Sequence, residues 1–244
     1  MERQLQKLNW PTVQKLVPDE IDTIILPVGT TEAHGPACLG TDNFIPTDIA
    51  IAIADRVNAL VAPTVNYGVT KSLYRYRGSS TINAETFSLY MRDILESFAD
   101  SEFKNIIIMN GHGGNNTALK SLAYEFHHDS ACNIAVVHWW MLCAEMTEKF
   151  FGNVGGHGGT DETAMVQAID PSLASKDDFE VEQAWFFKPG ADVYPVPGSI
   201  LLYKENEGYP NFDVEQARQY RKKVVEAVGD FVELVLSRWR KFKL

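Results

Sequence analysis

The sequence lacks the features that would place it among secreted or membrane proteins. Its 244 residues include three cysteines, Cys38, Cys132 and Cys143, so no even disulfide framework can form and we expect reduced thiols. No apolar run approaches the roughly 18 residues that a membrane-spanning helix needs. Residues 1–8 have no apolar core of the kind found in signal peptides. These absences predict a cytoplasmic protein with no membrane partner.

Basic side chains are also scarce. The chain has 22 lysines and arginines against 32 aspartates and glutamates, a formal net charge of -10. A local basic stretch around Lys71, Arg75 and Arg77 is small and interrupted by aromatic residues. A nucleic-acid partner requires clustered positive charge, so we expect none.

The sequence shows no internal repeat, low-complexity tract or linker, so we predict a single domain over residues 1–244. Apolar, β-branched runs predict strands, and segments with helical spacing alternate with them. The predicted strands are 21–28, 60–67, 105–109 and 133–138. The predicted helices are 46–59, 83–98, one that follows 115–116, one that ends near 150, and 160–168. This alternation predicts an α/β fold, a three-layer α/β/α sandwich with a mostly parallel sheet.

The remaining local signals concern helix ends and the last third of the chain. Asn83 and Thr160 are predicted N-caps, and Pro46 is expected in a first helical turn. Residues 173–207 mix aromatics and prolines, which predicts an irregular flap or a short hairpin. Asp213 and Gln216 resemble a capping box before a helix that ends near Trp239. The predicted apolar stripe of that helix is Val224, Val228, Phe231, Leu234 and Val235.

Side chains capable of metal chemistry lie on three loops that follow predicted strands. In the first loop, Glu32 and His34 are two residues apart, so they diverge and suit two neighbouring ions better than one. Asp42 follows a turn that can fold it back, and its two oxygens can bridge a metal pair. Carboxylate oxygen and imidazole nitrogen are ligands of divalent metals. The alternative is that Glu32 and Asp42 cap helices and His34 is a hydrogen-bonded loop residue.

The second loop places His112 between glycines, within residues 110–115. Its imidazole is predicted to stand where open α/β sheets bind ligands, with Asn110 and Asn115 orienting the ring. The alternatives are a turn that only packs closely and a turn that cradles a phosphate on its backbone amides.

The third loop carries His157, followed by Asp161 and Glu162 in the first turn of a predicted helix. Glu162 can complete a metal shell, while His157 can transfer protons near neutral pH. The alternative is that both carboxylates only stabilise the helix dipole.

The chain resembles the creatininase (creatinine amidohydrolase) family over most of its length. The matching segments are 26–36, 39–42, 110–115 and 157–163, and 76–82 is similar to the family's substrate-side loop. The resemblance implies an α/β/α sandwich, two divalent metal ions (zinc, manganese or iron) and hydrolysis of a C–N bond in a small, sometimes cyclic amide. It also implies a homo-oligomer, often a hexamer.

The resemblance implies a role for each site residue. Glu32 and His112 would bind one metal ion. His34 would bind the other, and Asp42 would bridge the two. His157 would sit over the small-molecule amide substrate as a catalytic proton shuttle.

The chain departs from creatininases at three places. The stretch between His34 and Asp42 is one residue shorter than usual, with Ala37 and Cys38 where the family often has His-Leu-Pro. Gly113 and Gly114 stand where creatininases carry an aromatic and an acidic residue, so we expect Glu162 or water to replace the missing ligand. Gly156 stands where an acidic residue precedes the third-loop histidine, which argues against creatinine as the substrate. The residues expected to contact substrate are Ser79, Gly113 and Trp185.

The sequence therefore predicts a metal-dependent amidohydrolase. Three alternatives stay open at this point. One is a hydrolase of formamido-pyrimidines, and another is a non-catalytic phosphate- or nucleotide-binding module that uses the glycine turns. The third is a family member that keeps a single structural metal ion.

Overall fold

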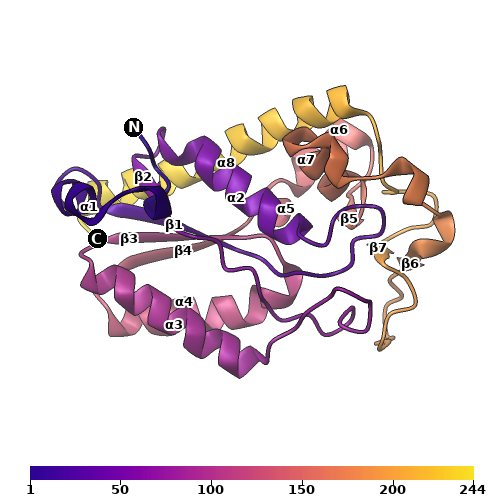
Figure 1. Ribbon diagram of the computed structural model, residues 1–244, viewed down its shortest axis with the longest axis horizontal. Coiled ribbons are helices and arrows are strands. Elements are labelled where there is room, and N and C mark those ends of the chain that lie inside the picture. The colour runs from indigo at the N-terminus through magenta and orange to yellow at the C-terminus, as the bar shows by residue number, and fades with distance from the viewer.

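A computed structural model describes residues 1–244 and contains one central sheet (Figure 1). Its strands are β1 (Thr23–Val28), β2 (Ala59–Val61), β3 (Asn105–Asn110) and β4 (Asn133–His138). They are all parallel and lie in the order β2-β1-β3-β4. Parallel neighbours place their carboxyl ends at one edge of the sheet, so the loops that follow β1, β3 and β4 meet there.

Helices occupy the connections between strands. They are α1 (Trp10–Leu16), α2 (Thr41–Ala54), α3 (Ala84–Asp100), α4 (Asn116–Asp129), α5 (Trp139–Leu142), α6 (Ala144–Phe151), α7 (Thr160–Ile169) and α8 (Val214–Phe242). Short 3-10 turns are η1 (Leu5–Lys7), η2 (Gly113–Asn115), η3 (Pro171–Leu173), η4 (Lys176–Asp178) and η5 (Val181–Gln183). No helix combines the length and the apolar character that crossing a bilayer requires.

Both faces of the central sheet are covered by helices. Successive strand residues point to opposite faces, so Ile24 and Ile25 enter different cores. One core packs the sheet against α2, α7 and α8, and the other packs it against α3 and α4 (Figure 1). This confirms the predicted three-layer α/β/α sandwich.

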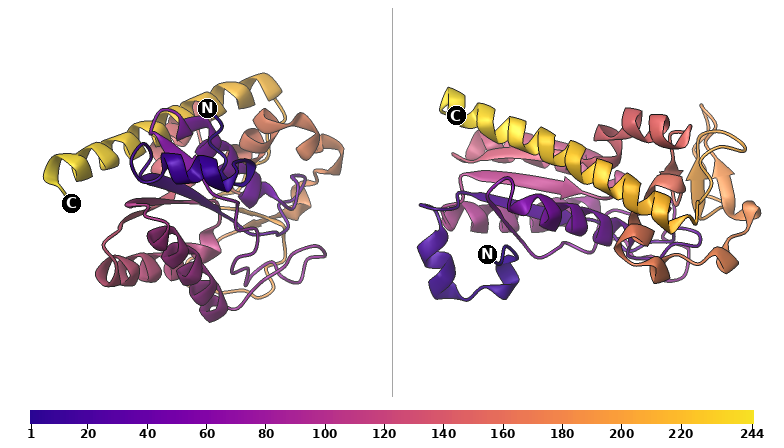
Figure 2. Two further views of the ribbon diagram at one scale, coloured as in Figure 1. Left: turned by 60° about the vertical axis from the view of Figure 1, so that its left-hand side comes forward. Right: turned by 90° about the horizontal axis from the view of Figure 1, so that it is seen from above.

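A second, smaller sheet lies at the end of the molecule opposite both termini (Figure 2). It consists of β5 (Gly156–His157), β6 (Ala184–Phe186) and β7 (Ile200–Leu202), in the order β5-β7-β6. β6 and β7 are parallel, so the hairpin considered for residues 173–207 is wrong. The sequence does not reveal this pairing, because each strand is only two or three residues long.

Helix α2 begins five residues earlier than predicted, and this places Asp42 in its first turn. Pro46 lies inside the helix and has no amide hydrogen to donate to the carbonyl of Asp42. That carbonyl oxygen packs against Gly29 and Gly111, where an added Cβ would lie 2.2 Å away in each case. Glycine at the ends of β1 and β3 therefore lets α2 start close to the sheet.

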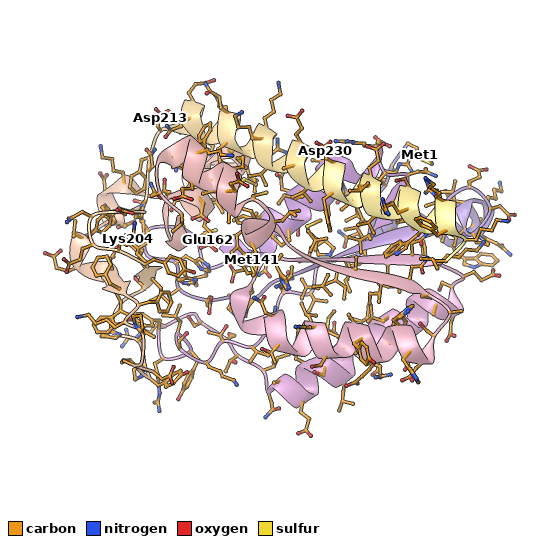
Figure 3. All side chains as sticks on the ribbon, turned by 180° about the vertical axis from the view of Figure 1, so that it is seen from behind. Met1, Met141, Glu162, Lys204, Asp213 and Asp230 are labelled. Atoms are coloured by element: carbon orange, nitrogen blue, oxygen red, sulfur yellow. The ribbon has the colours of Figure 1, made fainter.

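The last helix, shown from Asp213 past Asp230 in Figure 3, corrects the predicted stripe. Val224 and Val228 are buried as expected, but Leu234 is 53% exposed. The residues that continue the buried face at four-residue spacing are Val232 and Leu236.

Helix caps are partly as predicted. Asn83 accepts a hydrogen bond from the amide of Glu85, which confirms that N-cap. Asp213 accepts from two amides of α8, but the Gln216 side chain bonds Asn211 instead of reaching back, so only half of the capping box forms. The N-cap predicted at Thr160 is wrong by one residue, because Gly159 holds the N-cap position of α7 and Thr160 is the first residue of the helix. The strand predicted over 60–67 is limited to β2.

Replacing Gly111→Ala tests the close approach of α2 to the strand ends. The new methyl group would overlap the Asp42 carbonyl, so we expect the free energy of unfolding to fall by about 1–3 kcal/mol. Gly113→Ala is the matched control, because a Cβ there would meet only Trp140, at 3.9 Å. Urea unfolding of both variants measures the difference, and equal losses would contradict this packing.

Candidate metal centre

Five chemically active side chains converge at the carboxyl edge of the central sheet. Two come from the loop after β1, one from the start of α2, one from the loop after β3 and one from the first turn of α7. All five residues are buried. They are Glu32, His34, Asp42, His112 and Glu162.

Asp42 lies at the centre of the group, with one oxygen toward each of two imidazoles. Its Oδ1 is 2.9 Å from Nε2 of His34, and its Oδ2 is 2.8 Å from Nδ1 of His112. Glu32 Oε1 lies 3.1 Å from the same His112 nitrogen. Glu162 Oε2 lies 3.6 Å from the same His34 nitrogen.

These contacts form two three-residue groups that share Asp42. One contains Glu32, Asp42 and His112, and the other contains His34, Asp42 and Glu162. In each group, the candidate ligand atoms lie within 4.8 Å of one another. The structure thus brings together every residue that was predicted to bind metal.

Hydrogen bonds to backbone carbonyls fix the orientation of both imidazoles. His34 donates from Nδ1 to the Glu32 carbonyl at 3.0 Å, and His112 donates from Nε2 to the Val69 carbonyl at 3.0 Å. In the neutral ring, the other nitrogen then holds a lone pair that faces carboxylate oxygens. Such an arrangement is typical of metal-binding histidines.

A buried oxygen of Asp42 is further evidence that these residues suit a divalent cation. Asp42 Oδ2 is buried and accepts no well-aligned hydrogen bond, although His112 lies beside it. Buried carboxylates without hydrogen-bond donors are costly unless they are paired or coordinate a metal. Imidazole nitrogen and carboxylate oxygen also suit Zn²⁺ and Mn²⁺.

The carboxylates of the group strongly raise the pKa values of its two histidines. Burial opposes protonation of His34, but Asp42 and Glu162 outweigh it and raise the pKa of His34 to about 10. Burial is likewise outweighed by Glu32 and Asp42 at His112, whose pKa lies well above its usual value. Without a cation, the doubly protonated, positively charged form of both imidazoles is therefore favoured.

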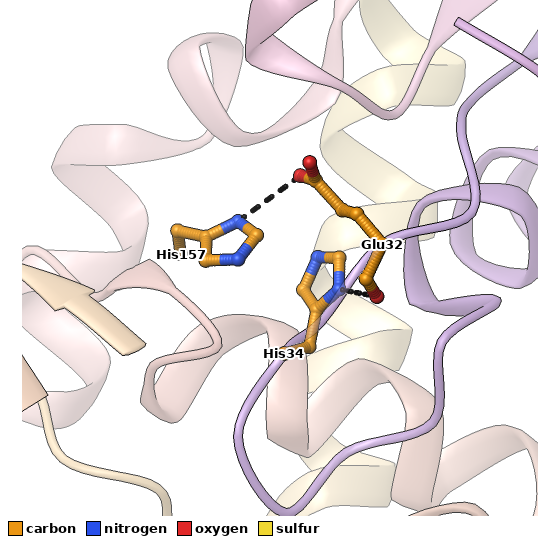
Figure 4. Close-up of side chains that lie close together, drawn as sticks. All are labelled: Glu32, His34 and His157. Carbon is orange, nitrogen blue, oxygen red and sulfur yellow. Dashed lines mark hydrogen bonds and ion pairs between the residues drawn. The ribbon is translucent and has the colours of Figure 1, made fainter. Parts of the chain in front are cut away.

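His157 stands beside Glu32 and His34, one residue from each group (Figure 4). Its Nε2 donates to the carbonyl of Ala33 at 2.7 Å, and its Nδ1 lies 3.5 Å from Glu32 Oε1. The ring centroids of His157 and His34 are 4.1 Å apart. Burial, followed by the positive charge of His34, lowers the pKa of His157 to about 4. Glu32, His34 and His157 form a third group of ligand atoms within 4.8 Å.

A cavity of about 630 Å³ opens onto the centre. Gly113 lines it, as predicted for a substrate contact, and so do Met141 and Glu162, which are labelled in Figure 3. Trp185 lines a separate cavity of about 210 Å³. Ser79 is not in the cavity wall, and its hydroxyl accepts a hydrogen bond from the amide of Ala33.

Comparison with known proteins decides the family. The family model described as creatininase, creatinine amidohydrolase, matches residues 6–221. This chain belongs to the creatininase family.

Known relatives align with most of this chain. The creatinine amidohydrolase of Pseudomonas putida is 28% identical in an alignment of 212 residues that covers 78% of this chain and 80% of the relative. The mycofactocin precursor peptide peptidase of Mycobacterium ulcerans is 28% identical in an alignment of 203 residues that covers 78% of this chain and 74% of the relative. A mutant creatininase structure of the Zn–Zn type is 24% identical, with a TM-score of 0.75 over 95% of this chain and 97% of the other.

Geometry explains why this creatininase-family chain has glycine at position 114. A Cβ there would lie 2.1 Å from the Val69 carbonyl oxygen and 2.4 Å from His112 Nε2. The hydrogen bond that orients His112 therefore occupies the space of a side chain. Glu162, which was expected to replace the missing metal ligand, lies in the candidate group of His34 and Asp42.

Several cavity residues were not predicted to contact substrate. Trp140, Asp161, Phe187 and Tyr203 all line the cavity. Phe187 and Tyr203 fall in the irregular segment 173–207. Only Asp161 carried a signal, because it precedes Glu162 in the same helical turn.

Asp42→Asn tests the shared position of this carboxylate. An amide offers one oxygen in place of two, so we expect retained zinc to fall from about two ions per chain to one or none. Asp48→Asn is the matched control, because Asp48 lies in the same helix and pairs with Arg221 away from the centre. Elemental analysis after gel filtration measures the ratio. A ratio near one in the wild type would contradict a dinuclear centre.

Zinc binding is expected to release protons. The raised pKa values of His34 and His112 mean that each ring must lose a proton before it can bind metal. Zinc affinity should therefore weaken as the pH falls. Calorimetric titration of metal-free protein in buffers of different ionisation enthalpy measures the release. A heat of binding that does not depend on the buffer would rule out this exchange.

Proposed function

We propose that this chain is a metal-dependent hydrolase that cleaves a C–N bond in a small amide at a dinuclear centre. The observation that carries the proposal is the sharing of Asp42 between two groups, each with its own imidazole and second carboxylate. Membership of the creatininase family supports hydrolysis as the reaction class.

The proposed ligands divide into two sets. Glu32 and His112 would hold one ion, His34 and Glu162 would hold the other, and Asp42 would serve both. Zn²⁺ or Mn²⁺ in such a site lowers the pKa of a bound water and polarises a carbonyl oxygen. The carbonyls of Glu32 and Val69 keep both rings in the orientation that this binding needs.

His157 is the imidazole that remains when each ion has one histidine. Its Nε2 is fixed by the Ala33 carbonyl, so Nδ1 is the atom free to exchange a proton with substrate. It lines the cavity beside Glu32. We assign it a proton shuttle: Nδ1 would accept a proton from the attacking water and pass it to the leaving nitrogen, a role that histidine commonly has in amide hydrolysis.

The cavity favours hydrolysis over the phosphate-binding alternative. No lysine or arginine lines it, whereas four carboxylates do. Gly113 and Gly114 also lie in its wall, where the absence of side chains lets a substrate approach the backbone closely. A phosphate would find four carboxylates and no lysine or arginine at this wall.

Activity of metal-loaded protein on small amides tests the proposed function. We expect the zinc- or manganese-loaded protein to hydrolyse at least one member of a panel of lactams, hydantoins, formamides and short peptides. A chelator should abolish this turnover, and added metal should restore it. Turnover that persists in metal-free protein would contradict the proposal.

His157→Gln tests the assigned proton transfer. We expect kcat to fall about 10²- to 10⁴-fold, because glutamine cannot donate a proton, while zinc content stays unchanged. His128→Gln is the control, since the His128 side chain is 80% exposed on α4. An unchanged kcat in His157→Gln would remove His157 from the mechanism.

A further inference from the structure

Asp161 is the carboxylate of the cavity wall that the candidate metal centre leaves unused. Four carboxylates line the cavity, and three of them, Glu32, Asp42 and Glu162, belong to the groups of candidate ligands. Asp161 belongs to none of these groups, yet it is only 4% exposed. A buried carboxylate on the wall of a substrate cavity is a candidate for substrate recognition.

Two glycines hold the Asp161 carboxylate in place. The amide of Gly156 donates to Oδ1 at 3.0 Å. A Cβ on Gly155 would lie 2.2 Å from the same oxygen, so only glycine leaves room for it. The backbone amides of Asp161 and Glu162 in the first turn of α7 also face this carboxylate and stabilise its charge. Stabilisation of the helix N-terminus alone does not require the carboxylate to be buried in the cavity wall.

Apart from the imidazoles of His112 and His157, the rest of the wall is aromatic or uncharged. The rings of Phe187 and Tyr203 lie 5.5 Å apart at an angle of 36°, and Trp140 also lines the cavity. Aromatic faces attract cations and tolerate flat uncharged groups. An anionic substituent would find no lysine or arginine in this wall.

We propose that Asp161 makes the site selective for amides that carry a cationic amine or another N–H donor close to the scissile bond, and that the cavity excludes anionic amides. This inference rests on the proposed hydrolase function. Asp161 accepts the donor of the substrate, and the absence of lysine and arginine leaves an anion without a partner. Repulsion of the wrong charge is an effective source of specificity.

Three hydroxamates with the same two-carbon chain test the selection in the zinc-loaded protein. β-Alanine hydroxamate ends in an ammonium group, propionohydroxamate in a methyl group and succinohydroxamate in a carboxylate. All three carry the same metal-binding head, so differences in affinity report the wall of the cavity. We expect each step from cation to neutral to anion to weaken binding about tenfold, as measured by calorimetry.

In Asp161→Asn, we expect the difference in affinity between the tightest and the weakest hydroxamate to shrink to about threefold or less. Zinc content and the affinity for propionohydroxamate should not change. Asp177→Asn removes the same charge from an exposed position outside the cavity and should keep the full spread. Equal affinities for all three compounds in the wild type would overturn the selection, whatever the folding of the variants, and would leave the hydrolase proposal standing. Failure of every hydroxamate to bind would overturn the metal centre and the selection together.

Discussion

The arrangement of the centre depends on one buried carboxylate. Asp42 directs one oxygen to His34 and the other to His112, and these histidines come from loops after different strands. Only a residue at the meeting point of both loops can do this. The start of α2 reaches that point because Gly29 and Gly111 leave space for the Asp42 carbonyl that Pro46 cannot pair. The packing that places the start of α2 against the strand ends therefore also determines where the Asp42 carboxylate lies.

The same constraint explains the electrostatics. Three carboxylates and two imidazoles share a volume from which water is largely excluded. Without a cation, protons on His34 and His112 compensate the negative charge, which is why their pKa values are raised. A divalent cation in the place of these protons would satisfy the same oxygens and the same nitrogens. His157, whose pKa is lowered by burial and by its positively charged neighbour, is left neutral beside them.

The sequence predicted the ligands better than their surroundings. Glu32, His34 and His112 were predictable because each follows a strong apolar strand, and the carboxyl ends of parallel strands converge. The partner of Glu162 was not, since the choice between His34 and His112 depends on how α7 packs. Strands β6 and β7 and Tyr203 were not predicted, because their positions depend on long-range contacts in a segment with no periodicity. Asp161 was predicted in the first turn of a helix, but its place in the cavity wall depends on how that helix packs. The extra turn of α2 was missed because Pro46 was taken as a helix start.

The most direct test of a two-metal centre built on Asp42 is diffraction at the zinc absorption edge from crystals of the zinc-equilibrated protein. The account predicts two anomalous peaks roughly 3.5–4 Å apart, each within bonding distance of a different oxygen of Asp42. A single peak, or two peaks of which only one is bound by Asp42, would contradict a centre built on this shared carboxylate.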